Sequence, residues 1–309
     1  MNELRFDGRV AIVTGAGRGI GRAYARLLAA RGARVVVNDL GSSIGGEGDD
    51  VAPASRVAAE IVAAGGVAIP DGNDVASPAG AQSLLDATLE GFGHVDIVVN
   101  NAGIIRWAGL PDADFDNLER HFAVHVAGSF NTTRAAWPLL VDQAYGRIVM
   151  TTSAGLFGLP KNLAYASAKG GVIGLTRSLS TAGARHGIRI NCIAPAAMTR
   201  MAGSVDNAAA PAGADTAPDP MAPDLVAPMA AFLAHEDCPV SGEIYAAGAG
   251  RFARIFIAST TGYLEQDHDP TIEDVAAHWA TINDETDYWV PADLMSWSAA
   301  FMAHLAPES

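Results

Sequence analysis

The sequence predicts an α/β fold in which a doubly wound parallel sheet of about seven strands is followed by a C-terminal helical extension. Two observations predict this fold. Short runs of β-branched residues alternate with segments of helical periodicity over about 250 of the 309 residues. The runs are apolar throughout, which is typical of parallel strands that helices cover on both faces. Half of all residues are apolar, enough for a large core.

Seven runs are predicted as strands, at residues 9–14, 34–39, 67–69, 95–99, 147–152, 189–193 and 243–246. The segments 21–31 and 166–184 carry apolar residues at helical spacing, and Gly32 stands where a helix C-cap is expected. Because crossovers between parallel strands are right-handed, a Rossmann-like arrangement is the simplest way to join these elements.

Two segments interrupt this alternation. Residues 41–54 form a polar, glycine-rich loop after the second predicted strand, and residues 203–224 are rich in Ala, Pro and Asp. A helix at 225–235 and the last strand follow the second segment. We therefore expect residues 1–250 to form one domain, with 203–224 as a substrate lid. The alternative for 203–224 is a linker between domains.

The alternation of strands and helices stops after residue 250. Thr271 and Asp274 have the spacing of a capping box, which predicts a helix from there to about Ile282. A second, apolar helix is predicted over residues 292–305. We expect residues 251–309 to pack on the first domain or on a neighbouring subunit.

Charge and composition exclude several kinds of partner. The chain has 20 basic and 34 acidic side chains, a formal charge of −14, whereas nucleic acids and anionic membranes bind basic surfaces. No apolar run reaches the roughly 18 residues of a membrane span, and the N-terminus is charged where a signal peptide is apolar. Cys192 and Cys238 give neither a disulfide framework nor zinc spacing. The lack of a signal peptide, a membrane span and a disulfide framework leads us to expect a cytoplasmic protein. Because His94, His121 and His186 have no neighbouring residues that could act as further metal ligands, we expect no metal site.

A glycine-rich segment, TGAGRGIG at residues 14–21, lies between the first predicted strand and the first helix. A phosphate bound there needs a turn without Cβ atoms and free backbone N–H groups at a helix N-terminus. A glycine-rich string alone is also typical of an ordinary tight turn, but its place at the start of a βαβ unit favours a dinucleotide site. The expected cofactor contacts are Gly15, Gly17, Arg18, Gly19, Ile20 and Gly21.

Asp39 ends the second predicted strand, 18 residues after Gly21. A carboxylate at this position accepts hydrogen bonds from the adenosine ribose hydroxyls and repels a 2′-phosphate, which favours NAD over NADP. Arg18 points to the opposite preference, because a guanidinium in the loop can bind a 2′-phosphate unless it is directed to solvent. A turn residue before Gly41 is the alternative interpretation of Asp39.

Three residues form a candidate catalytic group. Ser153 follows the fifth predicted strand, and Tyr165 and Lys169 lie one turn apart on the helix after it. Moving a hydride to or from a carbonyl carbon requires a proton at its oxygen, and a phenol with a pKa near 10 is a poor base at neutral pH. A nearby ammonium, together with a positive nicotinamide ring, lowers that pKa. A Tyr and a Lys on an ordinary amphipathic helix are the alternative.

The TGAGRGIG segment, NNAG at residues 100–103 and the Ser153, Tyr165, Lys169 set resemble the short-chain dehydrogenase/reductase family over about residues 4–250. The resemblance implies that Tyr165 is the general acid/base, that Ser153 binds the substrate oxygen and that Lys169 binds the nicotinamide ribose. It also implies further cofactor contacts at Asp74, Val75, Asn101, Ala102, Gly103, Pro195 and Thr199.

Within this family, the segments HVAGSF (125–130) and YAAGAG (245–250) are similar to the (3R)-hydroxyacyl-CoA dehydrogenase units of type 2 multifunctional enzymes, which also act on hydroxysteroids. His125 stands where many family members have an Asn that supports a proton relay. His125 either takes the place of that Asn in the relay, through its backbone or its ring, or is a hydrogen-bonded core histidine. Gly170 and Gly171 lie inside a predicted helix. The resemblance implies that this helix pairs with its symmetry mate in a homodimer or homotetramer, with packing inside one subunit as the alternative.

The sequence thus predicts an NAD-dependent enzyme that interconverts a secondary alcohol and a ketone. The expected substrate is a bulky apolar alcohol or ketone, such as a 3-hydroxyacyl-CoA or a hydroxysteroid. Two alternatives remain. The first is a 3-oxoacyl carrier-protein reductase, although docking of a carrier protein usually needs a basic patch on the enzyme and this chain is acidic. The second is a catalytically silent NAD-binding scaffold.

Overall fold

The computed structural model describes residues 3–199 and 219–305, and the chain divides into two compact units, Met1–Arg254 and Ile255–Ser309. The predicted boundary is at residue 250, and the assignment of the first unit as a dinucleotide domain stays a prediction. Most of the predicted substrate lid, residues 203–218, lies outside the described residues, so the lid stays a prediction.

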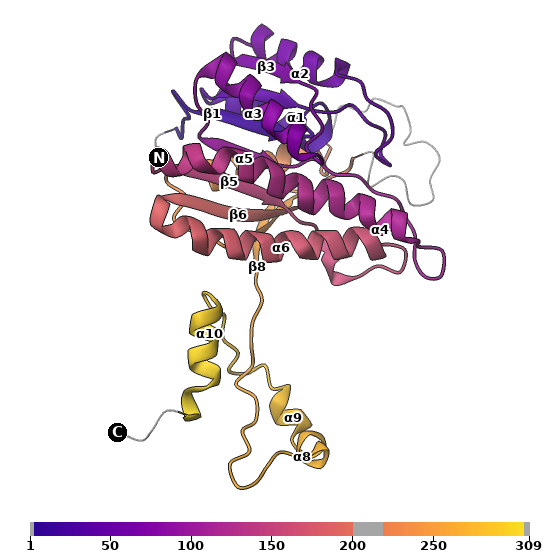
Figure 1. Ribbon diagram of the computed structural model, residues 1–309, viewed down its shortest axis with the longest axis vertical. Coiled ribbons are helices and arrows are strands. Elements are labelled where there is room, and N and C mark those ends of the chain that lie inside the picture. Colours follow the sequence, from indigo (N-terminus) through magenta and orange to yellow (C-terminus); the bar gives the residue numbers. More distant parts are fainter. Residues whose placement is uncertain (1–2, 200–218, 306–309) are drawn as a thin grey trace. The chain divides into compact units, whose positions relative to one another are not determined.

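Unit 1 is built on one eight-stranded sheet with the order β3-β2-β1-β4-β5-β6-β7-β8 (Figure 1). The strands are β1 Val10–Thr14, β2 Arg34–Asn38, β3 Val67–Asp71, β4 Ile97–Asn100, β5 Gly146–Thr151, β6 Ile188–Pro195, β7 Ile244–Gly248 and β8 Arg251–Ile255. Neighbours from β3 to β7 pair in parallel. The predicted fold class is confirmed, and all seven predicted strands form.

The eighth strand was not predicted. It follows β7 after only Ala249 and Gly250, and both of these residues have positive φ angles, +50° and +74°. A connection of two residues can join only antiparallel strands. The residues of β8 are mostly exposed, so they lack the apolar run that marks a central parallel strand.

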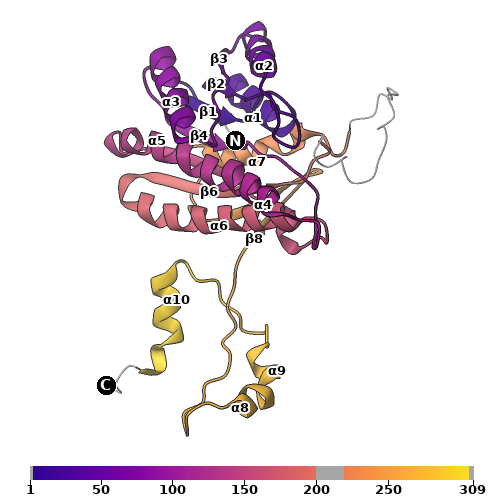
Figure 2. The same cartoon turned by 45° about the vertical axis from the view of Figure 1, so that its right-hand side comes forward.

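Helices cover both faces of the sheet (Figures 1 and 2). Their bounds are α1 Gly19–Ala30, α2 Ala52–Ala63, α3 Pro78–Phe92, α4 Phe115–His121, α5 Gly128–Asp142, α6 Leu163–Gly183 and α7 Ala227–Ala234. One core cluster joins α1, α2 and α7 to the sheet through apolar residues such as Leu28, Ile61 and Leu233. The helices α3, α5 and α6 lie on the opposite face (Figure 2). A π-helix, Phe122–Ala127, connects α4 to α5 without a break.

Buried charged side chains form hydrogen bonds and ion pairs at the end of the sheet where β1 and β4 begin. Asp96 is 4% exposed, and its carboxylate accepts from the backbone N–H of Val10 (2.9 Å) and from the guanidinium of Arg9 (3.0 Å). The buried guanidinium of Arg147, at the start of β5, donates to backbone carbonyls and lies over the ring of Tyr145. These contacts fix where the central strands begin.

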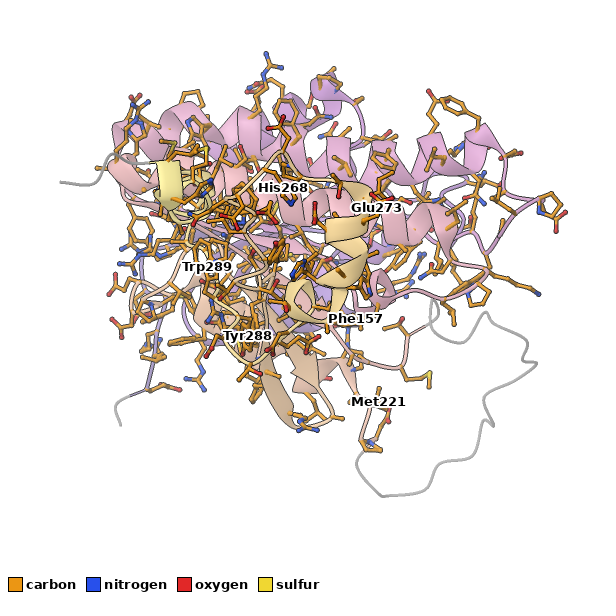
Figure 3. All side chains as sticks on the ribbon, turned by 90° about the horizontal axis from the view of Figure 1, so that it is seen from below. Phe157, Met221, His268, Glu273, Tyr288 and Trp289 are labelled. Atoms are coloured by element: carbon orange, nitrogen blue, oxygen red, sulfur yellow. The ribbon has the colours of Figure 1, made fainter. Side chains whose placement is uncertain are left out.

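Unit 2 contains α8 Ile272–Ala277, α9 Trp279–Ile282, α10 Leu294–Phe301 and a 3₁₀ turn at Ala303–Leu305. The predicted capping box is present: Thr271 and Asp274 exchange hydrogen bonds at the start of α8. The helix expected to reach Ile282 is interrupted at His278. An antiparallel bridge joins Ser259 to Trp289, which neighbours Tyr288 (Figure 3).

No described residue of unit 2 is buried, and many of its large apolar side chains, including Trp279 and Phe301, are exposed. Across the part of the chain that the structure describes, every helix is too short or too polar to cross a membrane.

We expect Asp96→Ala to lower the free energy of unfolding by about 2–4 kcal/mol, because it leaves the buried N–H group of Val10 without its acceptor and removes one of the two carboxylates that pair with Arg9. Urea denaturation followed by circular dichroism measures the change. The control is Asp7→Ala, which removes an exposed carboxylate paired with Arg5 and should leave the midpoint nearly unchanged. Equal midpoints for the two variants would contradict this role of Asp96.

Candidate active site

A cavity of about 660 Å³ lies at the carboxyl ends of the central strands of unit 1. Most of the predicted cofactor contacts line it: Gly15, Arg18, Gly19, Ile20, Gly21, Asp39, Asp74, Val75, Asn101, Ala102, Gly103 and Thr199. Among the residues predicted to bind the cofactor, Gly17, Tyr165, Lys169 and Pro195 do not line the cavity; Pro195 ends β6. Ligands of open α/β sheets bind at this edge, where the strand order reverses.

The glycines between β1 and α1 allow a close approach of backbones. A Cβ at Gly15 would lie 2.8 Å from Cα of Ala102, and one at Gly21 would overlap the carbonyl oxygen of Gly15. Gly15 and Gly19 also have positive φ angles, +62° and +52°. The turn, which we call the cradle, is therefore closely packed at the N-terminus of α1, and backbone N–H groups at such a terminus suit a pyrophosphate.

Asn101 holds this turn against the end of β4. Its side-chain amide donates to the carbonyls of Thr14 (3.0 Å) and Gly15 (3.1 Å). The Thr14 hydroxyl accepts from the backbone N–H groups of Asn101 and Ala102, both at 3.0 Å. Asn101 thus fixes the shape of the cradle from the β4 side, in addition to lining the cavity.

Asp39 lies where the sequence predicts it, just after β2. Its carboxylate accepts from the backbone N–H groups of Gly17 (2.8 Å) and Gly41 (2.7 Å). A Cβ at Gly17 would lie 2.7 Å from an oxygen of this carboxylate. Arg18 also lines the cavity and donates to the carbonyl of Ser42 (3.3 Å), so it is not simply directed to solvent.

Several cavity residues were missed by the sequence analysis. Asn38 ends β2 and donates to the carboxylate of Asp71 (2.6 Å) and to the carbonyl of Asn73 (2.9 Å). The other missed residues that line the cavity are Leu40, Ser42, Ser43, Ile44 and Gly46 after β2, Asn73 and Ala76 after β3, and Ile104, Asp116, Glu119, Arg120, Ala123 and Val124 after β4. Their place after β2, β3 and β4 was the available signal, because these strand ends share one edge.

Ser153, Tyr165 and Lys169 lie close together beside this cavity. Ser153 follows β5, and its hydroxyl accepts from the N–H of Gly155 (3.0 Å) and is hydrogen-bonded to the Tyr165 phenol. The ammonium of Lys169 lies 5.5 Å from the centre of the Tyr165 ring. It donates to the carbonyl of Thr151 (2.8 Å), so the end of β5 fixes both Ser153 and Lys169.

Burial dominates the electrostatics of this group. It raises the pKa of the Tyr165 phenol, and the hydrogen bond from Ser153 offsets only part of that change. Burial also lowers the pKa of Lys169 from 10.5 to about 8. In the chain by itself the phenol pKa is therefore raised, because desolvation of the phenolate outweighs the hydrogen bond from Ser153. The predicted lowering also involves a positive nicotinamide ring, so it stays a prediction.

Two buried histidines lie against Tyr165. The rings of His121 and His125 are stacked 5.8 Å apart, and the centre of the His125 ring lies 5.3 Å from that of Tyr165. His125 Nε2 lies 2.9 Å from the carbonyl oxygen of Ile104, and burial lowers the pKa of its ring well below 6.5. A Cβ at Gly103 would lie 2.6 Å from the His125 ring, so this ring connects Tyr165 to the wall of the cavity.

The hydrogen bonds of His125 fit the alternative of a hydrogen-bonded core histidine only in part, and the alternative that His125 replaces the usual Asn stays a prediction. Its Nε2 atom is hydrogen-bonded, but its Nδ1 atom has no hydrogen-bond partner among the described residues. The ring is neutral at pH 7, because its pKa is lowered. His121, in contrast, is satisfied on both sides: it contacts the carbonyl of Asn117 (2.7 Å) and accepts from the N–H of Arg106 (3.2 Å).

We expect the stability difference between the wild type and Lys169→Met to depend on pH. Below about pH 8 the folded chain holds a buried ammonium, whereas the unfolded chain keeps its proton up to about pH 10.5. Folding therefore releases a proton between these values, and the wild type gains stability relative to the variant as the pH rises. The gain from about pH 7 to about pH 10 is on the order of 3 kcal/mol, measured by denaturation. A difference independent of pH would contradict a buried ammonium.

Comparison with known proteins identifies the family. A family model described as short chain dehydrogenase matches residues 9–209. The short-chain type dehydrogenase/reductase Rv0148 of Mycobacterium tuberculosis is 40% identical over 281 residues, 89% of this chain and 94% of that protein. The peroxisomal multifunctional enzyme type 2 of Mus musculus is 40% identical over 289 residues, which are 92% of this chain but only 38% of the mouse enzyme.

Two further comparisons bear on the chemistry. The hydroxyacyl-CoA dehydrogenase ChsB1 of Mycobacterium tuberculosis is 38% identical over 254 residues, 79% of this chain and 78% of that enzyme. The solved structure of a 7α-hydroxysteroid dehydrogenase with NADH and a 7-oxo bile acid has a TM-score of 0.70 and 29% identity, covering 81% of this chain and 98% of that one. The chain therefore belongs to the short-chain dehydrogenase family and is an oxidoreductase acting on a CH–OH group.

Proposed function

We propose that the chain uses NAD to interconvert a secondary alcohol and a ketone on a bulky apolar substrate, either a 3-hydroxyacyl-CoA or a hydroxysteroid. The observation that carries this proposal is the meeting of Ser153, Tyr165 and Lys169 beside a glycine-cradled cavity. The cradle fits a dinucleotide, because Gly15 and Gly21 let the turn pack closely at the N-terminus of α1, where a Cβ would collide with Ala102 or with the carbonyl oxygen of Gly15. Bound there, the nicotinamide supplies or accepts the hydride.

In the proposed mechanism, each of the three residues acts at the substrate oxygen or next to it. Ser153 holds that oxygen by hydrogen bonding, and the Tyr165 phenol donates its proton there during reduction and takes a proton back during oxidation. Lys169 is mostly protonated at neutral pH, since its pKa is about 8, and its charge favours the phenolate that forms after proton transfer. It is also the proposed ligand of the nicotinamide ribose.

Asp39 supports NAD as the cofactor. Its carboxylate lines the cavity, and a 2′-phosphate placed next to it would be repelled. The related 7α-hydroxysteroid dehydrogenase structure contains NADH. Arg18 lies in the same cavity and is the residue that would favour NADP, although its guanidinium donates to the carbonyl of Ser42.

Apolar side chains near Ser153 support an apolar substrate. Phe157 and Leu159, in the segment between β5 and α6, are 72% and 51% exposed, and Leu110 is 80% exposed. A bridge between Ala108 and Asn162 joins these two segments, so their exposed apolar groups belong to one region of unit 1. A fatty acyl chain or a steroid ring system would cover such groups.

The chain is also proposed to form a homodimer or homotetramer through α6. A Cβ at Gly170 would meet no atom within 4 Å, so this side of the helix has room for another backbone. Gly171 differs, because a Cβ there would lie 3.2 Å from Val126 of the same chain. The exposed apolar residues of unit 2 lead us to propose that it packs on unit 1 or on a neighbouring subunit.

We expect Tyr165→Phe to lower turnover by at least about 10²-fold while NADH binding stays within about twofold, because only the proton-carrying hydroxyl is lost. NADH absorbance follows turnover on hydroxyacyl-CoA, hydroxysteroid and 3-oxoacyl carrier-protein substrates. The control is Tyr145→Phe, at the opposite end of the sheet, which should keep full activity. Undiminished turnover by Tyr165→Phe would refute the mechanism. NADH binding without turnover of any substrate by the wild type would support the silent scaffold.

We expect Asp39→Asn to reduce the preference for NAD over NADP at least tenfold, because the substitution removes the charge that repels a 2′-phosphate. The measurement is kcat/KM with each cofactor in the wild type and the variant. A wild type that prefers NADP would show that Arg18, rather than Asp39, sets the cofactor.

A further inference from the structure

The loop after β2, residues 40–50, has a fixed shape of its own, and we call it the strap. The backbone N–H of Asp50 donates to the carbonyl of Leu40 at its neck, and the N–H of Ser43 donates to the carbonyl of Glu47 at its tip, both at 2.8 Å. Gly41 is needed at the neck, because its φ angle is +78° and a Cβ would overlap the Asp50 backbone. These hydrogen bonds join the two ends of the strap and close its tip.

The tip of the strap is attached to the segment after β4. The N–H of Ile105 donates to the carbonyl of Ile44 (3.0 Å), and a Cβ at Gly46 would lie 3.0 Å from the Ile104 side chain. In the sheet, β1 lies between β2 and β4, so the strap spans the carboxyl end of β1. Its residues Leu40, Ser42, Ser43, Ile44 and Gly46 line the same cavity as the glycine-rich turn that follows β1.

Arg106 makes the polar contacts that hold the tip in place. Its Nε donates to the carbonyl of Gly45 (2.8 Å), and its other nitrogens pair with Glu47 on the strap (3.3 Å) and Asp116 on α4 (3.1 Å). The backbone N–H of Arg106 donates to the buried ring of His121 (3.2 Å). The guanidinium is thus fixed to α4 on one side and to the strap on the other.

We infer that Arg106 latches the strap over the bound dinucleotide, and that the strap must detach from Arg106 for the dinucleotide to enter and leave. The inference rests on the proposed function, since it takes the cavity to be a dinucleotide site. Arg106 acts here as a positioning residue, because it works through the strap. Arg18 adds a longer contact with the carbonyl of Ser42 (3.3 Å).

A latch has a kinetic signature that a merely supporting contact lacks. When a closed strap blocks both entry and exit, weakening the latch raises the association rate and the release rate together. A residue that only stabilises the bound cofactor changes the release rate alone. The pairs with Glu47 and Asp116 are partly exposed, so salt should weaken the latch in the wild type.

The test is stopped-flow measurement of NADH binding and release by fluorescence, with the full chain and its Arg106→Met variant. We expect both rates to rise about tenfold in the variant, equivalent to about 1.4 kcal/mol. Release from the wild type should accelerate with added KCl, and release from the variant should not. Arg106→Lys should give an intermediate rate, because lysine keeps the charge but loses the fork. The control is Arg5→Met, which removes an exposed guanidinium paired with Asp7 and should leave both rates unchanged.

A rise in the release rate alone, or no change in either rate, would overturn the latch while leaving the dinucleotide site intact. Failure of the wild type to bind NADH would instead refute the proposed function on which the latch depends. If Arg106→Met does not fold cooperatively, Glu47→Gln provides the same test with an exposed residue. Its expected effect is a two- to threefold rise in both rates.

Discussion

The ammonium of Lys169 is held in a buried position, where desolvation destabilises its charged form. Its pKa falls to about 8, and the neighbouring phenol of Tyr165 is also penalised for ionising. Lys169 is kept there by the structure around it: the carbonyl of Thr151 accepts from its ammonium, and the hydroxyl of Thr152 donates to its backbone carbonyl (2.8 Å). The free-energy cost of this arrangement is met by the packing of the parallel sheet. Buried groups with shifted pKa values of this kind are typical of catalytic sites.

The parallel sheet brings the components of the site together. Because the carboxyl ends of its strands share one edge, the turn after β1, Asp39 after β2, Asn101 after β4 and Ser153 after β5 converge although they are far apart in the sequence. Glycines allow the closest approaches, and Asn101 ties the β4 end to the cradle. The π-helix after α4 then directs His125 between Gly103 and Tyr165.

Elements with a strong local pattern were predictable from the sequence. The seven apolar strands, the glycine-rich turn and the Tyr165–Lys169 spacing each depend on nearby residues, and each was placed correctly. Strand β8 was not predicted, because it lies at the edge of the sheet without an apolar run. Residues 41–54 were predicted as a polar loop, but the attachment of the strap was not, because it depends on Arg106, which is 61 residues from Gly45. The direction of the Tyr165 pKa shift also depends on burial, which the sequence does not give. The π-helix has no sequence signal that we recognise.

The central claim is that Tyr165 is a poor base in the free chain and becomes a competent one when the oxidised cofactor is bound. The most direct measurement is an NMR titration of the chain with ¹³C-labelled tyrosine, in which Tyr165→Phe identifies the resonance. We predict a Tyr165 pKa above the usual value of about 10 in the free chain, and a fall of at least about two pH units with NAD⁺ bound. A pKa that is the same with and without NAD⁺ would contradict the account.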